Sequence, residues 1–160
     1  MAVFAKNTLT QVSGFDNQII AGELVYNQKT YWNLALNTDG TAIDLTGATI
    51  NAQIIRRKLS NVQDTRYGLS FDISDYTPTP TAIPLTITNL SATTGQFTLT
   101  IDDSAWSLTT TDTDLDIASI NGAGFSGRIK ISFPASGTTP ANDLIIFLLF
   151  LVRSDAIVVN

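Results

Sequence analysis

The sequence predicts an all-β fold, and residue usage and hydrophobic pattern both favour it. Thr and Ile are β-branched and suit strands, and the chain contains 23 Thr and 17 Ile in 160 residues. Residues that favour exposed helices are scarce, because Lys and Glu together occur five times and Glu only once. Several segments alternate apolar with polar residues, which is the period of a half-buried strand.

The length and composition indicate one ordered domain with a sparsely charged surface. The apolar fraction is 44% and the charged fraction 14%, values typical of a globular protein rather than a disordered one. A sandwich of the immunoglobulin type takes about 100 residues. We therefore predict an immunoglobulin-like two-sheet β-sandwich over residues 21–160, an extended arm over residues 1–20, and an apolar C-terminal strand.

The predicted arm has no clean period but carries large apolar side chains, among them Phe4, Phe15, Ile19 and Ile20. We expect it to pack on its own domain or on a neighbouring subunit rather than to remain a loose terminus. Residues 1–11 lack the apolar core of a signal peptide.

Strands are then expected at residues 21–26, 30–36 and 49–57, separated by a turn at residues 37–40 (Asn-Thr-Asp-Gly) and a bend at Gly47. Three prolines in residues 77–84 predict a crossover and argue against a central strand there. Residues 85–89 and 97–101 should form a hairpin. Further strands are expected at residues 113–117, 125–133 and 157–159, with a helical turn at residues 103–108 capped by Asp102 or Asp103.

Residues 144–152 (Leu-Ile-Ile-Phe-Leu-Leu-Phe-Leu-Val) form the most apolar run of the chain. A membrane-spanning helix needs about 20 such residues, so this run is too short to span. As a strand it would present apolar side chains on both faces, whereas one face of an antiparallel sheet normally alternates polar residues toward water. We therefore predict that the arm or another subunit covers its second face.

Several of these segments together resemble a known family. They are residues 37–40, the Asp-Leu-Thr-Gly-Ala stretch at 44–48, the strand that ends in basic residues, and the Gly-Gln-Phe-Thr-Leu-Thr-Ile stretch at 95–101 with the polar residues 102–108. The arrangement resembles a β-sandwich of bacteriophage structural proteins, the N-terminal domain of the baseplate upper proteins, over residues 30–133. The resemblance implies a virion protein of the tail or baseplate. After Trp106 the chain departs from that pattern, because a longer Thr- and Asp-rich stretch replaces a short Gly-Arg-Tyr strand.

The residue inventory excludes several chemistries. With no Cys and no His, the chain has no disulfide, no Cys or His zinc site and no Ser-His-Asp triad. The net charge of −5 argues against broad contact with nucleic acid. We expect no catalytic residue, no metal, no cofactor and no membrane partner.

Two sets of Asp residues each have a functional and a structural interpretation. Asp112, Asp114 and Asp116 are spaced as at the start of a calcium loop, but Ile117 and Ala123 stand where that loop requires Gly and Glu; a solvated acidic strand is the simpler interpretation. A glycosidase could use two carboxylates held about 5–10 Å apart. For the candidates Asp72, Asp75, Asp102 and Asp103, loop and cap roles are simpler.

A basic cluster and a set of aromatics also have two interpretations each. Arg56, Arg57, Lys58 and Arg66 could meet an acidic neighbour or a phosphate, or could be a solvated strand end. The aromatics could form a sugar-stacking platform or belong to the core; they are Tyr26, Tyr31, Trp32, Tyr67, Tyr76 and Trp106.

These observations predict a non-enzymatic virion protein that packs against other virion subunits, including copies of itself, in the tail or baseplate or as a capsid decoration protein. The alternative is a carbohydrate-binding module of a host-recognition device. The predicted interface residues are Phe4, Phe15, Ile19, Ile20, Arg56, Arg57, Lys58, Phe147, Leu149 and Leu151.

Overall fold

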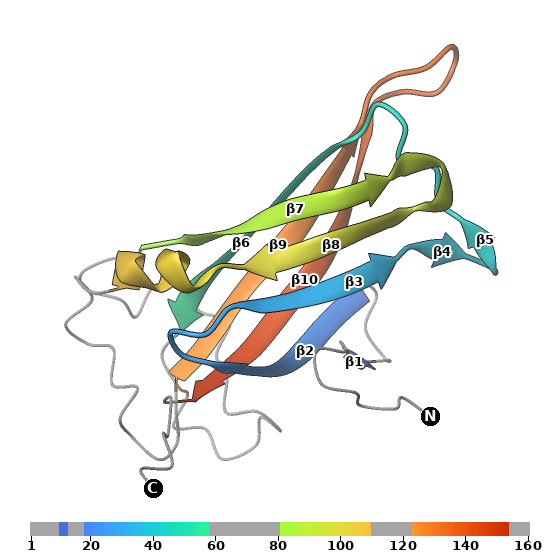
Figure 1. Cartoon of the computed structure of the whole chain (residues 1–160). Helices are drawn as coiled ribbons and strands as arrows, with labels where there is room; N and C mark the ends of the chain where they lie inside the picture. Colours follow the sequence, from blue (N-terminus) through green and yellow to red (C-terminus); the bar gives the residue numbers. More distant parts are fainter. Residues whose placement is uncertain (1–9, 13–17, 58–80, 110–122, 154–160) are drawn as a thin grey trace, which may run out of the picture.

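The computed structural model describes residues 10–12, 18–57, 81–109 and 123–153. These residues form strands and two 3₁₀ helices, so the predicted all-β class is confirmed (Figure 1). The elements are β1 (Thr10–Val12), β2 (Gln18–Val25), β3 (Thr30–Ala35), β4 (Asn37–Thr38), β5 (Thr41–Ala42), β6 (Thr49–Arg57), β7 (Ile83–Ser91), η1 (Ala92–Thr94), β8 (Gln96–Ile101), η2 (Asp103–Thr109), β9 (Ala123–Phe133) and β10 (Asn142–Arg153).

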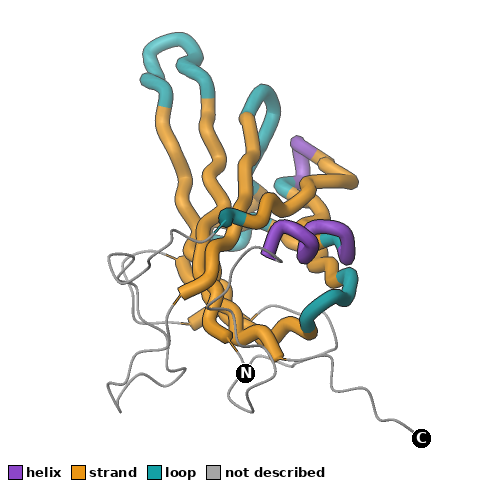
Figure 2. Tube along the Cα trace, turned by 90° about the vertical axis from the view of Figure 1, so that its left-hand side faces the viewer, coloured by secondary structure: helices purple, strands orange, loops and turns teal. Residues whose placement is uncertain are grey.

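Eight strands form one hydrogen-bonded series in the order β1-β2-β10-β9-β6-β7-β8-β3, and β4 pairs with β5 separately. Strand β7 joins the two halves of the series, because it pairs with β6 through Ile83–Leu85 and with β8 from Thr86 onward. The series therefore curls around a common interior (Figure 2). Neighbours β7-β8-β3 and β6-β9-β10 correspond to the two layers of an immunoglobulin-type sandwich, with the layers continuous through β7.

Strand β10 is central in its layer. It pairs antiparallel with β9 from Asn142 to Val152 and parallel with β2 from Ile146 to Arg153. The parallel partner connects the first part of the described chain with the last. Backbone groups on both sides of β10 are thereby satisfied, which suits the burial of its side chains.

Aromatic side chains fill the space between the layers. Trp32 of β3 stacks on Phe150 of β10 with ring centroids 5.2 Å apart, and both residues are at most 4% exposed. Trp106 of η2 is fully buried and meets Phe125 edge to face at 5.9 Å. Its indole N–H donates to the Gln28 carbonyl at 3.1 Å, so the polar end of the ring is satisfied.

The turns follow the predicted chemistry. Asp39 and Gly40 have φ values of 50° and 80° and connect β4 to β5. Positive φ at both central residues is the signature of a type I′ hairpin turn, which Asp-Gly favours. The bend at Gly47 is also present, with φ 76°.

Two predictions about strand limits are wrong. Strand β2 begins at Gln18 rather than at residue 21, so Ile19 and Ile20 belong to the sheet and not to the arm. Pro84 lies inside β7, which is a central strand, although the prolines argued against one. Pro84 is tolerated because β8 pairs with β7 only from Thr86 onward, so at Pro84 the strand has a neighbour on one side alone. The predicted strands at residues 113–117 and 157–159 lie outside the described residues.

The close approach of β9 to β6 depends on Gly127. A Cβ atom at this position would lie 1.9 Å from the Gln53 carbonyl oxygen and 2.8 Å from the Ile54 Cα. Both atoms belong to the backbone of the paired strand β6, so neither can move without disturbing the ladder.

We predict that Gly127→Ala lowers the free energy of unfolding by about 3 kcal/mol, at the upper end of ordinary overpacking costs. Denaturant unfolding monitored by tryptophan fluorescence measures the effect. Gly22→Ala is the matched control on β2, which is separated from β9 by β10, because its Cβ would make only ordinary contacts, at 3.8 Å, with the Phe150 ring. Equal stability of the two variants would contradict the close approach.

Candidate interaction surface

The side chains of β10 divide into two apolar sets. Ile146, Leu148, Phe150 and Val152 are at most 1% exposed and belong to the main core. Leu149, from the alternate set, belongs to a separate cluster with Ile19 and Ala21 of β2, and Phe147 packs against it. Because side chains alternate across a strand, the second set lies on the outer face. The predicted two-sided apolar character of residues 144–152 is therefore confirmed.

We call this second set the outer β2–β10 face and define it by Ile19, Ala21, Ile145, Phe147, Leu149 and Leu151. The strand register places Phe147 opposite Ile19 and Leu149 opposite Ala21. Ile19, Ala21 and Leu149 are 9% exposed or less, whereas Ile145, Phe147 and Leu151 are half-buried. The face thus combines a covered centre with large apolar side chains that still meet water.

Charged residues border this face. On β9, Lys130 lies opposite Ile145 and Arg128 lies opposite Phe147. Lys130 pairs with Asp143 at 3.0 Å, and Arg153 pairs with Glu23 at 3.0 Å. Arg128 is exposed and makes no ion pair with any other described residue. The border is more basic than the chain as a whole, because these five charged side chains sum to +1 and the full sequence carries −5.

The ion pair at Asp143 is accompanied by a cross-strand hydrogen bond. Asp143 lies opposite Ser132. Hydrogen bonds from the side chains of Ser132 and Lys130 hold the pKa of the Asp143 carboxyl below its usual 3.8. Both side chains of the ion pair are more than a third exposed, so its contribution to stability is that of a surface pair.

The structure brings only part of the predicted interface together. Ile19, Phe147, Leu149 and Leu151 share the outer β2–β10 face, whereas Ile20 is 8% exposed and belongs to the main core. Arg56 is 6% exposed and sits at an inward position of β6 opposite Phe125. It is therefore not part of a solvated basic strand end. Phe4, Phe15, Lys58 and the Arg57 side chain lie outside the described residues.

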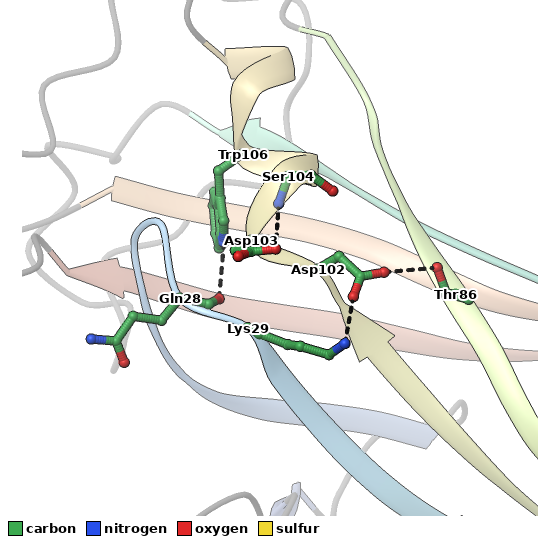
Figure 3. Close-up of polar contacts among 7 residues, drawn as sticks. All are labelled: Gln28, Lys29, Thr86, Asp102, Asp103, Ser104 and Trp106. Atoms are coloured by element: carbon green, nitrogen blue, oxygen red, sulfur yellow. Dashed lines mark hydrogen bonds and ion pairs between the residues drawn. The ribbon is translucent and has the colours of Figure 1, made fainter.

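The carboxylates at Asp102 and Asp103 have structural partners (Figure 3). Asp102 pairs with Lys29 at 2.9 Å and accepts a weak hydrogen bond from Thr86 at 3.5 Å. This interaction raises the pKa of the Lys29 ammonium. Asp103 accepts a hydrogen bond from the Ser104 N–H at 2.8 Å at the start of η2. This donor is the next residue along the chain, so the bond is not the N-cap bond to the second or third helical N–H that the prediction implied. Asp72, Asp75, Asp112, Asp114 and Asp116 lie outside the described residues.

The aromatics do not gather on one surface. Trp32 and Trp106 are in the core, and Tyr26 is half-buried against Trp106 with ring centroids 5.2 Å apart. Tyr31 is 48% exposed on β3. The core interpretation is therefore correct for three of the four described aromatics; Tyr67 and Tyr76 lie outside the described residues.

Sequence reasoning missed the contributions of Ala21, Ile145, Arg128 and Lys130 to this surface. The alternation of the β9 sequence could have placed Arg128 and Lys130 on one face. Their position beside the apolar set depends on the pairing of β9 with β10, which local pattern does not specify. Among the described residues, no three acidic side chains lie close enough to hold a metal ion, and no helix is long and apolar enough to cross a membrane.

The depressed pKa of Asp143 predicts an acid-dependent loss of stability. The unfolded chain binds this proton with a pKa near 3.8 and the folded chain with a lower pKa, so the carboxylate stabilises the fold above pH 3.8 and the contribution disappears as pH falls through the folded value. Asp143→Asn should therefore flatten the fall of unfolding free energy between about pH 5 and pH 2. Asp39→Asn, at an exposed turn position, is the control; an equal slope in both variants would refute the role of Asp143.

The chain was compared with known protein families and with curated proteins, and neither comparison finds a match.

Proposed function

We propose that this protein is a non-enzymatic structural subunit of a bacteriophage virion, which packs against other virion proteins and against copies of itself. The resemblance to phage β-sandwich domains suggests a tail or baseplate component, and a capsid decoration role is the other form of the same proposal. The outer β2–β10 face is the observation that carries the packing role.

This face is suited to protein contact by its composition. Ile145, Phe147 and Leu151 are half-buried in the isolated chain and border a cluster that is already covered. Full burial of such a side chain is worth about 1.5–3 kcal/mol. A neighbouring subunit that covers the remaining apolar area would gain part of this free energy, and the exposed Arg128 could pair with a carboxylate of that neighbour.

The low charge of the chain supports the same proposal. Charged residues make up about 25% of a typical soluble globular domain, whereas they make up 14% of this sequence. A subunit whose surface is partly buried in an assembly needs fewer charges to remain soluble.

The first prediction compares the two faces of β10. Leu148→Lys should unfold the protein, because Leu148 is fully buried and a buried unpaired charge costs several kcal/mol. Phe147→Lys should leave a folded domain, because Phe147 is half-buried on the outer face and the ammonium group can reach water. Circular dichroism melting and gel filtration of the two purified variants test this contrast.

The second prediction concerns assembly. In particles purified from a culture that produces all the phage proteins, the wild-type chain should be present and Phe147→Lys should be reduced at least several-fold. Leu90→Lys is the control, because Leu90 is 48% exposed on β7 in the other layer. A wild-type chain that is absent from every particle fraction would refute the virion role, and full incorporation of Phe147→Lys would refute the role of this face.

A further inference from the structure

A second feature of the molecule lies between the segment of residues 38–46 and the β9–β10 connection. A hollow of about 490 Å³, open to solvent along much of its extent, lies there, at the end of the molecule where the β4–β5 hairpin and the β9–β10 connection project (Figure 1). Small-molecule sites in proteins typically measure about 300–1,000 Å³. The loops at the ends of β-sandwiches are common places for binding sites.

The lining of this hollow is entirely uncharged. Apolar side chains and neutral hydroxyl or amide groups share it: Ile43, Phe133, Pro134 and Leu144 on the apolar side, and Thr38, Thr46, Ser136, Thr139 and Asn142 on the polar side. The apolar side is anchored, because Ile43, Phe133 and Leu144 also pack against the main core. The hollow therefore combines an apolar wall that is held in place with several short polar groups.

Hydrogen bonds fix the positions of polar residues that line the hollow. Ser136 and Thr139 exchange two backbone hydrogen bonds, at 3.0 and 2.9 Å, so the β9–β10 connection closes in a tight turn and its side-chain hydroxyls are not needed for that closure. The Thr46 hydroxyl donates to Asp44 at 2.6 Å, which leaves the Thr46 oxygen free to accept a hydrogen bond from a ligand.

We propose that this end hollow binds a neutral saccharide. A sugar ring presents hydroxyl groups around its edge and C–H groups on its faces, and the hollow offers partners for both: amide and hydroxyl groups for the edge, and the Phe133 and Pro134 rings for a face. A phosphate or a sialic acid would find no cation among the lining residues, and a cationic ligand would find no carboxylate there. An uncharged polyol needs no charged partner, so the uncharged lining is compatible with it.

This site does not depend on the proposed virion role. The lining residues of the hollow share none of the six residues of the outer β2–β10 face. A structural subunit with this hollow could contact surface glycans through its loop end while the outer β2–β10 face packs in an assembly. If saccharide binding is not observed, the virion role is still tested by incorporation into particles, and the reverse also holds.

The test titrates the ¹⁵N-labelled full chain with neutral oligosaccharides (maltohexaose, cellohexaose, chitohexaose and a rhamnose oligomer) up to their solubility limits. At least one should shift the amide signals of residues 38, 46, 136–139, 141 and 142 with saturable behaviour, whereas an oligogalacturonate should not. Thr139→Trp should weaken that binding by about tenfold or more, equivalent to about 1.4 kcal/mol, because the indole would occupy the hollow. Asn142→Ala should weaken it as well.

Thr41→Trp is the matched control, since Thr41 is exposed on β5 and does not line the hollow. It should bind like the wild type, and melting curves should show that all three variants remain folded. The proposal is overturned if no neutral oligosaccharide shifts these signals, if the shifts gather elsewhere on the domain, or if folded Thr139→Trp binds as well as Thr41→Trp.

Discussion

The position of β10 is the constraint on which the rest of this structure depends. The strand has a partner on each side, antiparallel β9 and parallel β2, so its backbone is satisfied laterally and its side chains can be apolar on both faces. The inward set supplies much of the core, and Trp32 stacks on Phe150 to join the two layers. The outward set creates an apolar surface that a sheet of the usual one-sided pattern would lack.

Strand β7 decides how the sheet closes around that core. It pairs first with β6 and then with β8, so one continuous series of strands supplies both layers. Trp106 closes the end of the sandwich at η2, where its indole is buried and hydrogen-bonded to Gln28. At the other end, residues of the segment 38–46 and of the β9–β10 connection line the hollow. Within the described residues, one end is therefore occupied by the Trp106 side chain and the other holds the hollow.

The two proposed contact regions would bind their partners through different interactions. The outer β2–β10 face is broad, apolar and bordered by ion pairs, a composition that favours contact with another protein surface through burial. The end hollow is small and neutral, and it offers directional hydrogen bonds beside an apolar wall, a composition that favours a small polyol. The two regions share no residue, although Leu144 of the hollow is followed by Ile145 of the outer β2–β10 face.

Much of the secondary structure was determined by local sequence alone. Strand β6 (Thr49–Arg57) and the Asp39-Gly40 turn follow from alternation and turn chemistry, which act between near neighbours. The strand at Pro84 and the inclusion of Ile19 and Ile20 in β2 were decided by tertiary structure, because each depends on which strand lies alongside.

The two proposed contact regions also depend on tertiary structure. The sequence shows that residues 144–152 are apolar on two faces, but only the pairing of β10 with β2 and β9 places Ala21 and Arg128 beside them. The end hollow brings together residues from Thr38 to Leu144, and no local pattern reports a contact between segments that far apart in the chain.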